Sequence, residues 1–251
     1  CAEESDMVYN RIDTFAKGSA MAYSTIYSCS EGSVMGYSTY NSCAFLLQKC
    51  AQMKDLTTGK HIHNLIFELS YVSYPQVQNH VLHMYVKCGA LTDAQKVFDM
   101  LPNLTTVSWN VLIAGYVQEG QGYDALNCFE HMKGEKLHPD AITFISLLQA
   151  CSTIGAINTG IQIHDEIISR GLLKKDIMLG TTLVDMYAKH GELVKAQKVL
   201  EEIPIRNAIA WNALISGHAQ KSQFHEAFDC FARMQREGLS PDVATFVCLL
   251  K

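Results

Sequence analysis

The sequence repeats itself with a period of about one hundred residues, and this feature constrains the fold more than any other. Segment 106–140 reads TVSWNVLIAGYVQEGQGYDALNCFEHMKGEKLHPD, and segment 208–242 reads AIAWNALISGHAQKSQFHEAFDCFARMQREGLSPD, so the two align without a gap. A second pair also matches, because MYVKCG at 84–89 returns as MYAKHG at 186–191. Repetition on this scale indicates a stack of similar units rather than one globular core.

Matched positions divide each period into three units of unequal length. Lengths of 35, 31 and 35 residues are followed by lengths of 36, 31 and 35, with the added residue near Leu172–Lys175. We call the first member of each period long, the second short and the third ordinary. The predicted units are 40–74, 75–105, 106–140, 141–176, 177–207 and 208–242, with a partial unit at 243–251.

Each unit carries the pattern of two short helices. In 106–140, apolar residues from Trp109 to Tyr116 recur at the spacing of one helical face, and the segment 119–122 interrupts them. A second apolar stripe runs from Ala125 to Met132 and ends before Pro139. Because two short helices cannot bury both apolar faces alone, we expect an all-α solenoid, a right-handed superhelix of stacked antiparallel helix pairs.

Composition separates the first 39 residues from the rest. Residues 1–39 are rich in Ser, Tyr, Gly and Cys, and contain the near-duplicate segments MAYST and MGYST. We expect a disordered tail there, with one or two helical turns at most. The whole chain has a net charge of −5, which weighs against a polyanionic partner because nucleic-acid-binding proteins usually have a basic balance.

The cysteines fall at equivalent places in successive periods. Cys50 matches Cys151, and Cys128 matches Cys230. This spacing favours small buried thiols in a reducing compartment over a disulfide framework. Trp109 and Trp211 also match and lie on the apolar helix face, so we expect them in the core rather than stacked on a ligand.

These motifs resemble the pentatricopeptide repeat family, specifically its plant PLS subclass, in which long, short and ordinary units alternate. The resemblance covers about 40–251 and rests on VSWNVLIAGY, AIAWNALISGH, HMYVKCGALTDAQKVFDMLP and DMYAKHGELVKAQKVLEEIP. The alternating lengths argue against the 34-residue tetratricopeptide repeat. The resemblance implies a protein of the mitochondrion or chloroplast whose units each address one base of single-stranded RNA.

The resemblance also implies which residues face the RNA in the ordinary units. The fifth and last residues of a unit would contact the base edge, and the second would wedge between bases. The residues at these places are Asn110, Asp140 and Val107 in the first ordinary unit, and Asn212, Asp242 and Ile209 in the second. Both Asn–Asp pairs favour uracil in this family. An Asn at the start of a helix is also a common capping residue, so a purely structural role stays open for each.

The short units carry a different pair at the same two places. Asn79 with Thr105 suggests a pyrimidine, and Thr181 with Asn207 suggests adenine. Small polar side chains of this kind can form hydrogen bonds with the Watson–Crick edge of a base.

The long units depart from this pattern. Their fifth and last residues are Ala44 with Tyr74 and Ile145 with Asp176. Because an apolar fifth residue cannot bond to a base edge, we expect these units to act as spacers. The predicted target is therefore 5′-N-Y-U-N-A-U-3′, with the chain and the RNA running in parallel.

No enzyme signature is complete. Segments 164–166 and 190–192 match the H-x-E part of the zinc deaminase signature, but no C-x-x-C occurs in the sequence. We therefore expect no catalytic residue, no metal site and no cofactor. If the chain takes part in cytidine-to-uridine editing, we expect the deaminase activity to come from a partner protein or from a deaminase domain that this fragment lacks.

Three functions stay open from the sequence. The first is sequence-specific binding of single-stranded RNA in organellar RNA processing or editing. The second is a helical scaffold for protein interactions, which the acidic balance supports. The third is a truncated, non-functional copy of an editing factor.

Overall fold

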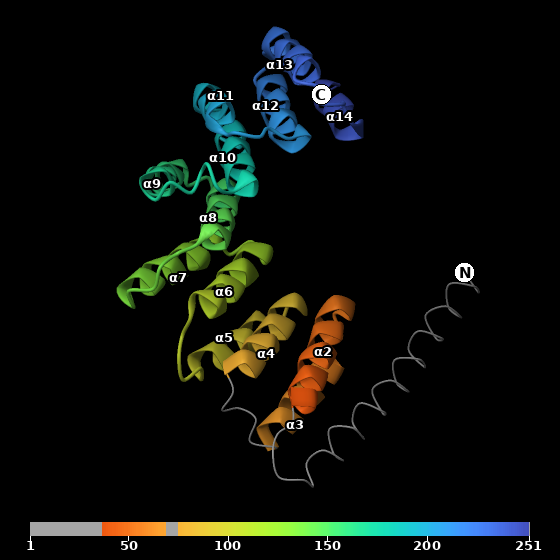
Figure 1. Cartoon of the computed structure of the whole chain (residues 1–251), viewed down its shortest axis with the longest axis vertical. Coiled ribbons are helices and arrows are strands. Elements are labelled where there is room, and N and C mark those ends of the chain that lie inside the picture. Colours follow the sequence, from red (N-terminus) through yellow and green to blue (C-terminus); the bar gives the residue numbers. More distant parts are fainter. Residues whose placement is uncertain (1–36, 69–74, 251) are drawn as a thin grey trace, which may run out of the picture. The chain divides into compact units, whose positions relative to one another are not determined.

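The computed structural model describes residues 37–68 and 75–250, and these residues form thirteen helices and no strand (Figure 1). Residues 1–36 of the predicted tail lie outside the described residues. The first described helix begins at Tyr37, three residues before the predicted start of the first unit. The helices are α2 (Tyr37–Met53), α3 (Leu56–Glu68), α4 (Pro75–Lys87), α5 (Leu91–Asp99), α6 (Thr106–Gln118), α7 (Gly122–Gly134), α8 (Ala141–Ile154), α9 (Ile157–Ser169), α10 (Ile177–Lys189), α11 (Leu193–Glu202), α12 (Ala208–Gln220), α13 (Phe224–Arg236) and α14 (Val243–Leu249).

The two helices of a unit are joined by a tight turn whose key residue has a left-handed backbone. At the end of α8, Gly155 has a φ of 74°, and the next residue, Ala156, donates its N–H to the Cys151 carbonyl at 3.0 Å. This reverse hydrogen bond closes the helix and turns the chain back on itself. The fifteenth residue of every unit from 40 to 242 has a positive φ, namely Lys54, Gly89, Gly120, Gly155, Gly191 and Ser222.

The chain divides into two compact regions, Cys1–Gly115 and Tyr116–Lys251. In the described part of the first, α2 contacts both α3 and α4, and α4 contacts α5. Gly59 of α3 allows the close approach of α4, because a Cβ atom there would lie 2.4 Å from the Met84 sulfur. The first helices of successive units therefore pack against one another, with the second helices on their flank.

The second region repeats this arrangement over more units. The first helices of the units contact one another in chain order, α8 with α10, α10 with α12 and α12 with α14 (Figure 1). The second helices α9, α11 and α13 each contact the first helix of their own unit and that of the following unit. Gly160 of α9 faces Met186 of α10 as Gly59 faces Met84. Each apolar helix face is thereby covered by a neighbouring unit, which makes the fold an all-α solenoid.

The core consists of residues at repeat-equivalent positions. Trp109 and Trp211 are buried, as predicted, and the Trp109 ring centroid lies 4.6 Å from that of Phe98. The four matched cysteines named above are free thiols, and their predicted burial is confirmed. Burial raises the pKa of Cys151 to about 11, so this thiol stays protonated at neutral pH. Within 37–68 and 75–250, every helix is too short or too polar to span a lipid bilayer.

Candidate nucleic-acid interface

In the four units from 106 to 242, the last residue is the N-cap of the helix that opens the next unit. Each of these side chains accepts the backbone N–H of the residue three positions later in the chain, at 2.8 to 3.0 Å. The four capping residues are Asp140, Asp176, Asn207 and Asp242. At the start of α6, the Ser108 N–H lies 3.3 Å from the Thr105 hydroxyl. The sequence left a capping role open for the asparagines at the fifth place, but the caps are last residues of units, and Asn212 lies inside α12 rather than at its N-cap. The cap leaves the second carboxylate oxygen of Asp242 and the amide nitrogen of Asn207 for other hydrogen bonds.

In the short unit 177–207, the fifth and last residues meet. The Thr181 hydroxyl donates to the Ile177 carbonyl at 2.8 Å, so its oxygen is left to act as an acceptor. The Asn207 amide donates to that oxygen at 3.1 Å, while the Asn207 carbonyl oxygen caps α12. Thr181 is buried and Asn207 is half-buried, so the pair lies at the edge between the helix and solvent.

In the ordinary unit 208–242, the fifth and last residues meet in the same way, with a third residue added. The Asn212 amide nitrogen donates to Asp242 at 3.1 Å. The hydroxyl of Thr245, a residue of the following unit, donates to the Asn212 carbonyl oxygen at 2.8 Å. Hydrogen bonds from the Thr245 N–H and hydroxyl, and then from Asn212, hold the pKa of Asp242 below its ordinary value. Asp242 is therefore an ionised acceptor at neutral pH.

Thr245 was missed by the sequence reasoning, although a signal for it exists. Asp140 is followed by Thr143 and Asp242 by Thr245, the spacing of a capping box. Both boxes are formed, since each aspartate accepts the threonine N–H and donates its own backbone N–H to the threonine hydroxyl. The spacing predicts the cap, but only the folded chain shows that Thr245 also reaches Asn212.

In the four units from 106 to 242, the second residue is an exposed apolar side chain. Val107 is 57% exposed and Ile209 is 60% exposed, whereas the neighbouring Ala210 is buried. Ile142 and Met178 occupy the same place in their units and are 60% and 53% exposed. Sequence reasoning did not include these two, although counting to the second residue would have found them.

The remaining predicted residues of the short and ordinary units lie near helix starts. Asn79 is half-buried in the second turn of α4, and Thr105 precedes α6. Asn110 is buried in α6 and belongs to the first compact region, while Asp140 belongs to the second. Each occupies the unit position that Asn212 and Asp242 occupy one period later.

The long units lack a polar fifth residue in the structure as in the sequence. Ala44 lies in α2 and Ile145 in α8, and both are half-buried. Asp176 caps α10 through the Leu179 N–H at 3.0 Å. The remaining member of this set, Tyr74, lies outside the described residues.

A repeated histidine–tyrosine contact joins each long unit to the short unit that follows. His63 Nδ1 lies 3.0 Å from the Tyr85 hydroxyl, and His164 Nδ1 lies 2.9 Å from that of Tyr187. Burial lowers the pKa of both histidines, so they are neutral at pH 7. The described residues contain no cluster of three or more His, Cys, Asp or Glu side chains that could hold a metal ion.

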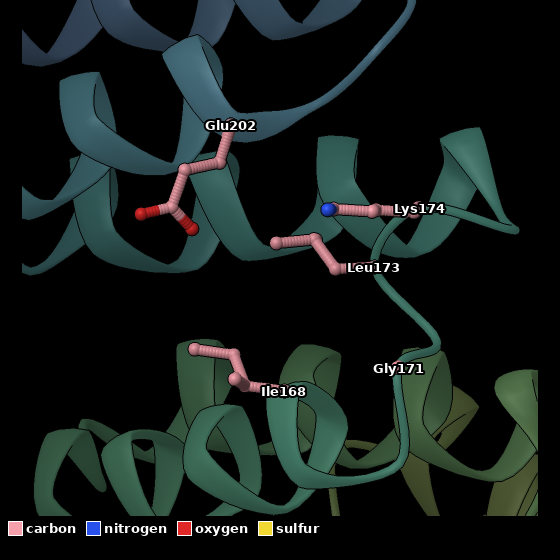
Figure 2. A pocket seen from close by; sticks show the side chains of 5 residues that line it. All are labelled: Ile168, Gly171, Leu173, Lys174 and Glu202. Atoms are coloured by element: carbon pink, nitrogen blue, oxygen red, sulfur yellow. The ribbon is translucent and has the colours of Figure 1, made fainter.

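One pocket lies apart from the predicted residues (Figure 2). Ile168 of α9, Glu202 of α11, and Leu173 and Lys174 of the connection between α9 and α10 point into a space of about 580 Å³, with Gly171 at its edge. The added residue of the second long unit falls in this connection. The pocket contains no fifth or last residue of any unit.

Comparison with known families settles the nature of the repeat. The PPR repeat family matches residues 104–153 and 206–251, and the PPR repeat matches residues 181–207. The chain belongs to the pentatricopeptide repeat family. The matched segments are therefore helical repeats of this family.

Related plant proteins are longer than the present chain. A chloroplastic pentatricopeptide repeat-containing protein of Arabidopsis thaliana is 35% identical over 206 residues, which are 82% of this chain and 33% of that protein. A mitochondrial one from the same plant is 32% identical over 206 residues, or 82% of this chain and 44% of that protein. The chain thus spans less than half the length of these relatives.

Solved structures of the family share the fold. The pentatricopeptide repeat protein PPR10 from maize superposes with a TM-score of 0.71 at 21% identity, over 91% of this chain and 33% of that chain. PPR10 in complex with an 18-nt psaJ RNA element superposes with a TM-score of 0.70 at 22% identity, over 92% and 34%. These likenesses establish the helical solenoid of this chain.

Proposed function

We propose that the chain binds single-stranded RNA in a sequence-specific way, with one base addressed by each short or ordinary unit. The observation that carries the proposal is the meeting of fifth and last residues in two successive units. Asn207 lies 3.1 Å from Thr181, and Asn212 lies 3.1 Å from Asp242. Membership of the family, and the RNA bound by PPR10, support the same assignment.

The chemistry of the Asn212–Asp242 pair favours uracil. Their mutual hydrogen bond uses one amide N–H and one carboxylate oxygen. Among the described residues, the second N–H and the second oxygen are then left to face a base. Uracil O4 accepts a hydrogen bond and uracil N3–H donates one, so the pair and the base edge are complementary. Asn110 and Asp140 have the same identities and are proposed to read uracil as well.

The Thr181–Asn207 pair favours adenine. The second N–H of Asn207 can donate to adenine N1, and the Thr181 oxygen can accept from the adenine amino group because its own proton goes to Ile177. For Asn79 and Thr105 we propose a pyrimidine. With the exposed second residues Val107 and Ile209 stacked between bases, the proposed target is 5′-N-Y-U-N-A-U-3′.

The biological setting proposed is RNA processing or cytidine-to-uridine editing in a plant mitochondrion or chloroplast. Chloroplastic and mitochondrial names among the relatives support the compartment. The alternation of long, short and ordinary units supports the PLS subclass. A partner protein would supply deaminase activity, because this sequence has no C-x-x-C to complete the zinc site of a deaminase.

Fluorescence anisotropy with labelled RNA tests the proposal. The chain should bind an oligonucleotide containing YUNAU, and exchange of U for G opposite Asn110 and Asp140 should weaken binding by about 1–3 kcal/mol, the value of one good base-edge contact. With a net charge of −5, the affinity should depend only modestly on salt. Absence of binding at low salt would contradict RNA recognition and favour a scaffold for protein partners.

A further inference from the structure

We propose that Thr245 is a positioning residue for the base-reading pair of the preceding unit. This inference rests on the proposed function and adds a third residue to that site. The hydroxyl oxygen of Thr245 lies 2.8 Å from the Asn212 carbonyl oxygen and 2.9 Å from an Asp242 carboxylate oxygen. Thr245 is fully buried, so its rotamer is fixed by packing and no RNA can reach it.

Donor and acceptor chemistry fixes the direction of every hydrogen bond in this network. The ionised Asp242 can only accept, so the Asn212 NH₂ group must face it. The Asn212 carbonyl oxygen is then turned toward Thr245 and requires a donor there. The single proton of the Thr245 hydroxyl lies between that oxygen, at 2.8 Å, and an Asp242 carboxylate oxygen, at 2.9 Å, and the hydroxyl oxygen accepts the backbone N–H of Asp242 at 3.1 Å.

The consequence of this network is a fixed orientation of the Asn212 amide. An amide held at both its nitrogen and its oxygen cannot rotate about its terminal bond. Its second N–H therefore keeps one direction. Preorganised donors of this kind discriminate more sharply between ligands than mobile donors, because less ordering is required on binding.

The neighbouring short unit supplies the contrast. Its fifth residue, Thr181, is anchored to a backbone carbonyl of its own helix. The third residue of the following unit there is Ala210, which has no hydroxyl. An asparagine at the fifth place thus requires the hydroxyl donor that Thr245 supplies. The unit 208–242 therefore depends on a residue outside its own boundaries.

The test compares base selectivity for three forms of the full chain. RNA containing YUNAU is bound by the wild type, by Thr245→Val and by Thr245→Ser, with the last base as U, C, A or G. Wild type should prefer U at the last position by about tenfold or more. Thr245→Val should reduce this preference to about twofold or less, and should leave the preference opposite Asn110 and Asp140 unchanged. Thr245→Ser should restore it.

A matched variant separates positioning from helix stability. Val243 is exposed in the first turn of α14, so Val243→Gly weakens that helix without touching Asn212. Loss of selectivity in Val243→Gly equal to that in Thr245→Val would overturn the inference, as would full selectivity in Thr245→Val. A wild type that binds without preference, or not at all, would overturn the proposed function itself and this inference with it.

Discussion

The two neighbouring units 177–207 and 208–242 hold the same kind of site by different means. Thr181 and Asn207 form a pair whose members are each anchored to backbone groups. Asn212 and Asp242 form a pair that is closed by a side chain of the next unit. The backbone places the fifth and last residues together in both cases. The identities of the side chains then decide which donors and acceptors face outward.

The largest expected effect comes from exchanging the last residue of the ordinary unit. Asp242→Asn keeps one oxygen for the cap of α14 but replaces the outward carboxylate oxygen with an amide donor. Uracil N3–H then loses its acceptor, whereas cytosine N3 gains a donor. The ratio of affinities for U and C at the last position should change by about tenfold to a hundredfold in favour of C. Anisotropy titrations with both RNAs measure the ratio.

The reciprocal exchange in the short unit sharpens this result. Asn207→Asp also preserves the cap, through the Ala210 N–H, but removes the donor proposed for adenine N1. It should abolish the preference for adenine at that position without creating one for cytosine. An unchanged adenine preference in this variant would contradict the adenine assignment of Thr181 and Asn207.

The next effect concerns the stability contributed by the two caps. Asn207→Ala removes the N-cap of α12, which contacts α10, α11, α13 and α14. It should lower the free energy of unfolding by about 1 kcal/mol. Asp242→Ala removes the cap of α14, which contacts only α12 and α13 among the described helices.

Amide hydrogen exchange distinguishes these two outcomes. Asn207→Ala should reduce protection in α12 and in the helices it contacts, because their packing opens together. Asp242→Ala should reduce protection mainly within α14. Equal, global loss in both variants would contradict the difference in packing between the two sites.

A smaller effect is expected at the turns of the same two units. Gly191 and Ser222 are each the fifteenth residue of their unit and have φ values of 72° and 58°. A left-handed backbone suits glycine and costs other residues about 1 kcal/mol. Ser222→Gly should therefore raise the midpoint of thermal unfolding by about 2–4 °C.

The opposite exchange provides the control for that turn. Gly191→Ser should lower the midpoint, because its added Cβ would be strained and would lie 2.3 Å from a side-chain carbon of Lys221. Circular dichroism melting curves of both variants give the comparison. A lower midpoint in Ser222→Gly would show that the serine side chain contributes more than the backbone strain costs.

The helical architecture could be predicted from the sequence because apolar periodicity and turn residues are local signals. Trp109 and Trp211 were placed in the core on this basis, and both are buried. The boundary of the first helix could not be placed as well. The start of α2 at Tyr37 falls in a stretch of Ser and Tyr that has no apolar period.

The site could be predicted only in part, because its hydrogen bonds cross between units. The spacing of Asp242 and Thr245 predicts a cap, but the contact of Thr245 with Asn212 joins residues 33 positions apart. Such a contact depends on how α12 and α14 pack, which no local pattern encodes. The base preferences of the pairs stay predictions until RNA binding is measured.

The smallest expected effect is a change in stability at acid pH, which should occur at Asp242 and not at Asn207. Asp242 has a lowered pKa in the folded chain because the Thr245 N–H and hydroxyl, and Asn212, donate to it. A depressed folded pKa contributes stability above the unfolded value of about 3.9, and this contribution is lost as pH falls through the folded pKa. Asn207 carries no charge and contributes no such dependence. Protection of the α14 amides in wild type relative to Asp242→Asn should therefore be constant from about pH 7 to 5 and should fall only below about pH 4. A relative protection that already changes between pH 7 and 5 would mean that a histidine, and not Asp242, governs the acid response of this site.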